Sequence, residues 1–214
     1  MRRLCASIAL VAVIILSTHT ASAVELPRLL SEIKQGGYVL VVRHVATDDS
    51  QKDVYPFVFD DMKKQRQLSE EGRKVAREMG GAMKALGIRF GEVYTSRLNR
   101  AVETGTLLST TRGKPVSELT DSGAGSTSAM AHPRGSNTKV GSAIRSLVNE
   151  SPPVGTNNLL VTHKTNITDA FGKSFGDVKE GETLVYKPNP AGSPTFVGRI
   201  KADEWLAQAS GRKS

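Results

Sequence analysis

Histidine and arginine side chains follow three separate apolar segments of this 214-residue chain. The segments and the residues after them are YVLVV before Arg43 and His44, EVYTS before Arg97 and Arg100, and NNLLVT before His163. Guanidinium groups form fixed, bidentate hydrogen bonds with phosphate, and a neutral imidazole is a nucleophile near neutral pH. If the three segment ends meet, these side chains would form a pocket for a doubly charged tetrahedral anion.

Each of these residues also has a simpler interpretation. A histidine at the end of a strand can hydrogen-bond the loop backbone, and Arg97 can point into solvent. Arg100 can pair with Glu71 or Glu103 on a helix surface. Their recurrence at equivalent positions of three segments favours one shared site over three separate explanations.

The elements that would position these side chains alternate between apolar strands and amphipathic helices. Strands are predicted over residues 38–42, 92–95, 115–119 and 158–162, with residues 183–186 and 195–200 as an antiparallel edge. Helices are predicted over residues 26–34, 70–86, 97–108, 140–148 and 166–171, followed by a C-terminal helix held by Trp205 and Leu206. The alternation predicts an α/β fold, a three-layer αβα sandwich with a mostly parallel central sheet and helices on both faces. Ligands of such sheets bind beyond the carboxyl ends of the strands.

Four sequence blocks, in this order, resemble the histidine phosphatase superfamily, also called the phosphoglycerate mutase-like family. They are Arg43-His44 after the apolar strand, QRQLSEEGR at residues 65–73, SRLNRAVET at residues 96–104 and LVTHKTNI at residues 160–167. The similarity extends over residues 37–200, which is most of the chain. It implies a phosphoglycerate mutase-like fold for a single domain, residues 24–214, and the activity of a phosphoric monoester hydrolase.

The resemblance also implies a role for each residue. His44 would attack phosphorus to form a phosphohistidine, while Arg43, Arg100 and His163 would hold the phosphoryl oxygens. Because these groups stabilise charge in a loose transition state, no metal ion and no other cofactor is expected.

The proton donor for the leaving oxygen is not evident from the sequence. Relatives commonly place a glutamate before the second histidine, but residues 121–146 contain none. Asp48 and Asp53, in the connection after the nucleophile, are the best candidates, with Asp48 taken as the catalytic residue, and Asp121 and His132 follow. An aspartate that hydrogen-bonds the backbone of its own turn is an equally good interpretation of Asp48.

The long polar connection over residues 45–67 is expected to be functional, since loops of this length in compact domains usually are. Gln65 and Arg66, at its end, either lean into the pocket or contact the start of the next helix. Val45 departs from the smaller residue that relatives carry after the nucleophile, and it would crowd a bound phosphate. Lys164, after the second histidine, is predicted to point into water.

The N-terminal segment is predicted to be a cleaved secretory signal. Arg2 and Arg3 precede an apolar run over residues 8–16, and Ala21-Ser22-Ala23 is typical of a signal-peptidase site. The run is shorter than the roughly 20 residues that a membrane span needs, so residues 1–23 are predicted to be removed and no stable membrane insertion is expected. Cleavage would also remove Cys5, the only cysteine. We therefore expect a periplasmic or secreted protein without disulfides.

The chain is basic, with a formal net charge of +8 at pH 7, but its lysines and arginines are scattered among acidic residues. This distribution favours a small phosphorylated molecule or an envelope component as the partner, and argues against nucleic acid. The predicted function is an exported phosphomonoesterase acting through phospho-His44. The alternative is a catalytically weak module of the cell envelope that binds phosphorylated ligands, because an effective proton donor is not apparent. The oligomeric state is not predicted.

Overall fold

The computed structural model describes residues 25–120 and 138–210. The predicted signal peptide and the candidates Asp121 and His132 lie outside these residues, so export stays a prediction. The helices and strands are α1 (Leu26–Gln35), β1 (Val39–Arg43), the 3-10 helix η1 (Met62–Lys64), α2 (Glu70–Ala85), β2 (Phe90–Ser96), α3 (Asn99–Ser109), β3 (Lys114–Val116), α5 (Thr138–Val148), β4 (Asn157–Thr162), α6 (Lys164–Phe171), the 3-10 helix η2 (Lys173–Phe175), β5 (Thr183–Lys187), β6 (Thr195–Ile200) and α7 (Ala202–Ser210). No helix in these ranges is long and apolar enough to cross a membrane.

The central sheet has six strands in the order β3-β2-β4-β1-β5-β6. The pairs β2–β3, β2–β4 and β1–β4 are parallel, whereas β5 pairs antiparallel with both β1 and β6. The predicted antiparallel edge is therefore confirmed. The strand predicted over residues 115–119 is shorter, because β3 ends at Val116 and Leu119 instead packs into the core.

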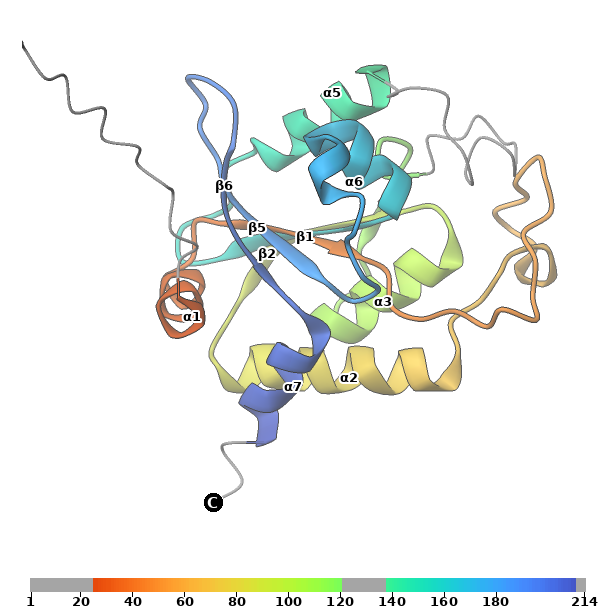
Figure 1. Cartoon of the computed structure of the whole chain (residues 1–214), viewed down its shortest axis with the longest axis horizontal. Coiled ribbons are helices and arrows are strands. Elements are labelled where there is room, and N and C mark those ends of the chain that lie inside the picture. Colours follow the sequence, from red (N-terminus) through yellow and green to blue (C-terminus); the bar gives the residue numbers. More distant parts are fainter. Residues whose placement is uncertain (1–24, 121–137, 211–214) are drawn as a thin grey trace, which may run out of the picture.

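Helices cover both faces of the sheet, which confirms the predicted three-layer arrangement. Figure 1 shows α5 and α6 on one side of the sheet and α2, α3 and α7 on the other. Along β1, Leu40 and Val42 pack with the second group, while Val39 and Val41 pack against α5 and α6. Because successive side chains of a strand point to opposite faces, a strand buried on both faces needs an uninterrupted apolar run. This is why residues 38–42 are continuously apolar.

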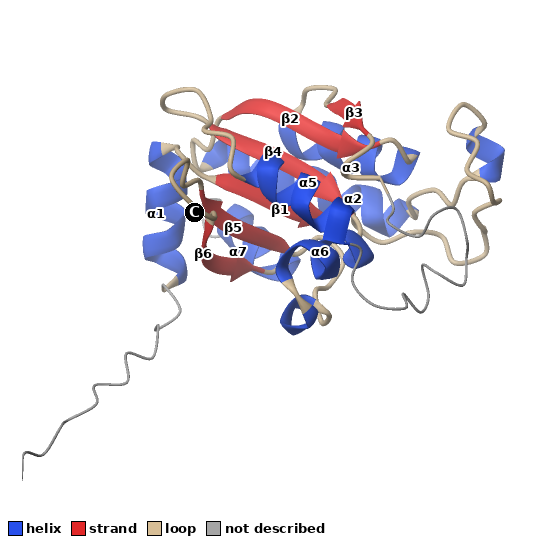
Figure 2. Cartoon of the chain, turned by 90° about the horizontal axis from the view of Figure 1, so that it is seen from above, coloured by secondary structure: helices blue, strands red, loops and turns tan. Residues whose placement is uncertain are grey.

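The start of α2 lies close to the chain that follows β1. Ser69 caps the helix, since its hydroxyl oxygen accepts a hydrogen bond from the Gly72 amide at 3.0 Å. A Cβ atom at Gly72 would lie 2.1 Å from the carbonyl oxygen of Ala46, so only glycine allows this approach. The contact holds Ala46, two residues beyond His44, against the first turn of α2. Figure 2 shows the parallel strands side by side, with the long connection that follows β1 beyond one end of the sheet.

Candidate active site

The two histidines that follow neighbouring parallel strands lie side by side. Arg43, at the end of β1, pairs with Thr162, at the end of β4, so that the next residues, His44 and His163, emerge at the same edge. Their ring centroids are 5.2 Å apart at an interplanar angle of 60°. Both rings are almost fully buried. The third segment ends at Ser96 on β2, whose hydroxyl lies 2.8 Å from Nε2 of His163.

The hydrogen bond of His44 selects which ring nitrogen can react. Nδ1 lies 2.8 Å from the carbonyl oxygen of Val45, and a carbonyl oxygen only accepts hydrogen bonds. Nδ1 must therefore carry the proton. In the neutral ring this leaves the lone pair on Nε2, which is the nitrogen available for nucleophilic attack.

Arg100 is a fully buried guanidinium with unused hydrogen-bond donors. Its Nη1 atom donates to Oδ1 of Asp53 at 2.9 Å, but Nε and Nη2 have no partner in the described part of the chain. Nδ1 of His163 is likewise buried and unpartnered there. Buried polar atoms almost always have a hydrogen-bond partner, so this group of nitrogens indicates the binding site of an anion.

Asp53 joins the long connection to the site. Its Oδ1 atom accepts hydrogen bonds from Arg100 and from the backbone amide of Arg66, the latter at 2.9 Å. The side chain of Arg66 lines the same pocket. Gln65, which the sequence left between two interpretations, does not line it. Instead, its side-chain oxygen Oε1 accepts a hydrogen bond from the backbone amide of Asn99 at 2.8 Å, so it fixes the connection to the first turn of α3, next to Arg100.

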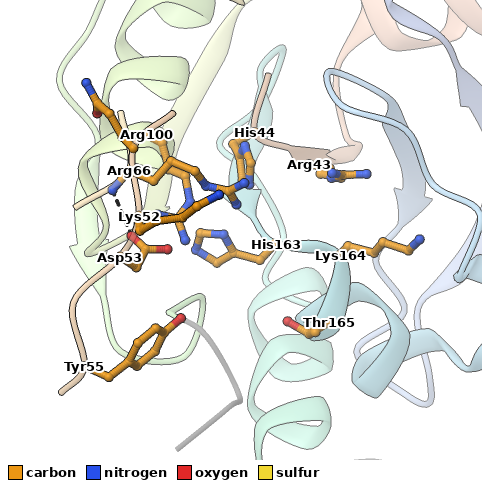
Figure 3. A pocket seen from close by; sticks show the side chains of 11 residues that line it. Arg43, His44, Lys52, Asp53, Tyr55, Arg66, Arg100, His163, Lys164 and Thr165 are labelled. Carbon is orange, nitrogen blue, oxygen red and sulfur yellow. Dashed lines mark hydrogen bonds and ion pairs between the residues drawn. The ribbon is translucent and has the colours of Figure 1, made fainter. Parts of the chain in front are cut away.

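Arg43 lines the pocket, but its guanidinium has protein partners. Nη1 donates to the carbonyl oxygen of Val178 at 2.9 Å, and Nη2 forms an ion pair with Glu180 at 3.0 Å. In Figure 3 Arg43 and Arg100 lie on opposite sides of His44, with Arg66 on the Arg100 side. The geometry therefore brings Arg66, rather than Arg43, together with Arg100. Nε of Arg43 has no partner in the described part of the chain, so one donor of this guanidinium stays available for the predicted contact with a phosphoryl group.

Asp48 is not among the residues that line the pocket, contrary to its place as first candidate for the proton donor. Its Oδ1 atom accepts hydrogen bonds from the amide and the hydroxyl of Ser50, at 2.9 Å and 2.7 Å. These bonds lower the pKa of the Asp48 carboxyl, so near neutral pH it is ionised and has no proton to donate. The alternative interpretation of Asp48 as a turn residue is the one that the structure shows. Asp53 is the only carboxylate among the described residues lining the pocket.

The pocket has a volume of about 350 Å³. Beyond the residues already described, it is lined by Gln51, Lys52, Tyr55, Lys164 and Thr165. Lys164 reaches its rim, and Figure 3 shows its ammonium group directed away from His163. Sequence reasoning missed Gln51, Lys52, Tyr55 and Thr165, although the unusual length of the 45–67 connection was a signal for the first three.

Burial keeps both imidazoles neutral. Desolvation lowers the pKa of His44 well below its ordinary value, and the charge of Arg100 lowers it further. The pKa of His163 is lowered well below its ordinary value by the same two causes, with a smaller contribution from His44. Near neutral pH, His44 therefore has the free lone pair that nucleophilic attack requires.

The two lowered pKa values predict that acid destabilises the fold. As the pH falls below about 6.5, the unfolded chain binds protons at both histidines while the folded chain does not, so stability decreases with decreasing pH. The loss is expected to approach about 1.4 kcal/mol per pH unit for each histidine. Urea unfolding between pH 7.5 and pH 5.5 measures it. The double variant His44→Asn, His163→Asn should lack this component, and an unchanged pH dependence in that variant would contradict the prediction.

Comparisons with known proteins bear on the family and on the fold. The family model described as the histidine phosphatase superfamily (branch 1) matches residues 39–122. Comparison with curated protein sequences gave no match. Among solved structures, the protein histidine phosphatase SixA complexed with tungstate is similar at 18% identity and a TM-score of 0.54, over 78% of this chain and 97% of that chain. A phosphoserine phosphatase from Entamoeba histolytica in complex with 3-phosphoglyceric acid is similar at 14% identity and a TM-score of 0.53, over 79% and 99%.

A third similar structure is the alpha-ribazole phosphatase from Shigella flexneri, at 17% identity and a TM-score of 0.52, over 75% of this chain and 95% of that chain. At these identities the structures establish the fold. The sequence match and the fold together confirm the resemblance to the histidine phosphatase superfamily that the four sequence blocks indicate. The family match also supports the expected class of enzyme, a phosphoric monoester hydrolase.

Proposed function

We propose that this protein hydrolyses a phosphate monoester through a phosphohistidine on His44, and that it acts as an exported enzyme after cleavage of residues 1–23. The observation that carries the activity is a set of buried pocket nitrogens without a partner in the described chain: Nε and Nη2 of Arg100, Nε of Arg43 and Nδ1 of His163. These donors fit a tetrahedral dianion. The substrate is a phosphorylated small molecule or a phosphorylated component of the envelope.

The reaction proceeds in two displacements. Nε2 of His44 attacks phosphorus as the bond to the ester oxygen breaks, and the leaving oxygen takes up a proton. Water then attacks the phosphohistidine and gives a proton to the carboxylate that was deprotonated in the first displacement; the nitrogen–phosphorus bond breaks, and phosphate leaves with the ring restored. The donors of Arg100 and His163 stabilise the equatorial oxygens in both transition states, where charge is spread over the transferring group.

In this proposal a protonated Asp53 donates its proton to the leaving oxygen in the first displacement. Its Oδ1 atom is held by Arg100 and by the Arg66 amide, and Figure 3 shows the other carboxylate oxygen directed toward His163. Asp53 also has a second role, because its ion pair with Arg100 orients that guanidinium. The two roles differ in how they depend on the leaving group, since a weakly basic oxygen leaves without protonation.

The variant Asp53→Asn separates these roles. We expect it to slow hydrolysis of an alkyl phosphate, such as glycerol 3-phosphate, by roughly 10²-fold and that of p-nitrophenyl phosphate much less. Asp48→Asn, which alters only the turn at Ser50, is the matched control and should leave both rates nearly unchanged. An equal loss on both substrates would show that Asp53 only orients Arg100.

The same assay tests the proposed activity against a module that binds phosphate esters without hydrolysing them. The wild-type protein should release p-nitrophenol over many turnovers, because this leaving group tolerates a poor proton donor. Binding of the compound without turnover would overturn the proposal.

A further inference from the structure

We infer that Ser96 fixes the proton of His163 on Nδ1, so that this nitrogen donates a hydrogen bond to a phosphoryl oxygen. The inference rests on the anion site of the proposed function. Ser96 is a positioning residue here, because its hydroxyl acts on the substrate only through the His163 ring. It is the last residue of β2 and is fully buried.

The hydrogen-bond partners of the Ser96 hydroxyl determine the direction of each bond. Within the described chain, Oγ has two partners: the Leu98 amide at 3.2 Å and Nε2 of His163 at 2.8 Å. The amide can only donate, so Oγ accepts from it. Among the described residues the hydroxyl proton then has one hydrogen-bond acceptor, which is Nε2. Ser96 therefore donates to Nε2, and the neutral ring carries its own proton on Nδ1.

The opposite tautomer of His163 would be unfavourable for two reasons. If Nε2 carried the proton, Oγ would accept twice and its own buried proton would lack an acceptor, which costs free energy. Nδ1 would also present a lone pair to the site where Arg100 leaves Nε and Nη2 unpartnered. A lone pair there would repel the oxygens of an anion. With the proton on Nδ1, all three unpartnered atoms are donors.

The backbone between β2 and α3 explains why the Ser96 hydroxyl is oriented to donate to Nε2 of His163. Leu98 is the residue that precedes the first turn of α3, and its side chain cannot cap the helix. The bond from its amide to Ser96 instead holds the turn that leads to Arg100. The Ser96 hydroxyl, at the end of β2, is thus hydrogen-bonded both to the turn that leads into α3, the helix that carries Arg100, and to the second histidine.

Nuclear magnetic resonance of the ring nitrogens tests the inference directly. At pH 7.5, long-range proton–nitrogen spectra should show His163 as a neutral ring protonated at Nδ1, with its signals assigned by their loss in His163→Gln. In Ser96→Ala the ring should shift toward protonation at Nε2. A wild-type ring protonated at Nε2, or at both nitrogens, would overturn the inference, as would an Nδ1 proton unchanged in Ser96→Ala.

Binding of orthovanadate gives the second readout. We expect Ser96→Ala to weaken vanadate binding about 10-fold, as for the loss of one hydrogen bond. Ser96→Thr keeps a hydroxyl and should restore both the tautomer and most of the affinity. The matched control is Thr95→Val, because Thr95 is buried on the same strand and its hydroxyl has no partner in the described chain. An equal loss of affinity in the control would contradict a role specific to Ser96.

These measurements separate the inference from the proposed function. The tautomer and vanadate affinity are read without turnover, so they test Ser96 even in a protein that fails to hydrolyse phosphate esters. Failure of turnover with the expected tautomer would overturn the hydrolase alone. Normal turnover with the opposite tautomer would overturn the inference alone.

Discussion

Replacing His44 with alanine is expected to reduce turnover of p-nitrophenyl phosphate by at least about 10³-fold, because the variant lacks the nucleophile of the first displacement. The hydrogen bond from Nδ1 to the Val45 carbonyl leaves Nε2 as the free nitrogen, and the ring lies 5.2 Å from that of His163. No other described residue lining the pocket offers an unprotonated ring nitrogen except His163, whose Nε2 is bonded to Ser96. Steady-state release of p-nitrophenol measures the effect.

Two controls connect this loss to covalent chemistry. The variant should retain measurable binding of vanadate, since Arg100 and His163 remain, and its thermal unfolding should show that it is folded. When the wild-type protein is mixed with substrate and quenched in alkali, a phosphoryl group should be detected on the peptide that contains His44. Turnover by His44→Ala close to that of the wild type would exclude His44 as the nucleophile.

Arg100→Lys is expected to lower kcat/KM by about 10²-fold or more, although the positive charge is kept. Lysine can still pair with Asp53, but its ammonium cannot reproduce the unpartnered Nε and Nη2 donors that face the anion site. The matched substitution Arg97→Lys should change kcat/KM by less than about threefold, well below the effect of losing an anion-site donor. Arg97 is exposed, and its guanidinium lies 3.9 Å above the ring of Phe59, outside the pocket.

The comparison of these two arginines tests where the anion sits. Both belong to the block SRLNR and differ by three positions, yet only Arg100 points inward from α3. Thermal unfolding of each variant controls for damage to the fold. Equal losses of kcat/KM in the two folded variants would show that the anion does not bind at Arg100.

The fold was largely predictable from local patterns. The apolar run of β1 indicated a strand buried on both faces, and Ser69 with the glutamates after it indicated the start of α2. Four blocks in the expected order then implied how the strands are arranged. Element ends were less predictable: β3 ends earlier than expected because its pairing with β2 stops at Val116.

The carboxylate of the site could not be predicted in the same way. Asp48 and Asp53 lie five positions apart in one irregular connection, where no periodicity indicates which side chain points inward. The choice depends on contacts from distant elements, namely the ion pair of Asp53 with Arg100 and the turn that Asp48 makes with Ser50. Arg43 is a similar case, since its pairing with Glu180 joins residues 137 positions apart.

The sequence by itself determined the order of strands and helices, the polar residues at three strand ends, and therefore the edge of the sheet at which a site would form. These features follow from side-chain periodicity and from the identity of residues next to each strand, which are local properties. Only the tertiary structure decided which ring nitrogen of each histidine carries the proton, how many donors each arginine keeps free, and which aspartate reaches the pocket. Hydrogen bonds between residues far apart in the chain make these choices, and such bonds exist only once the chain has folded.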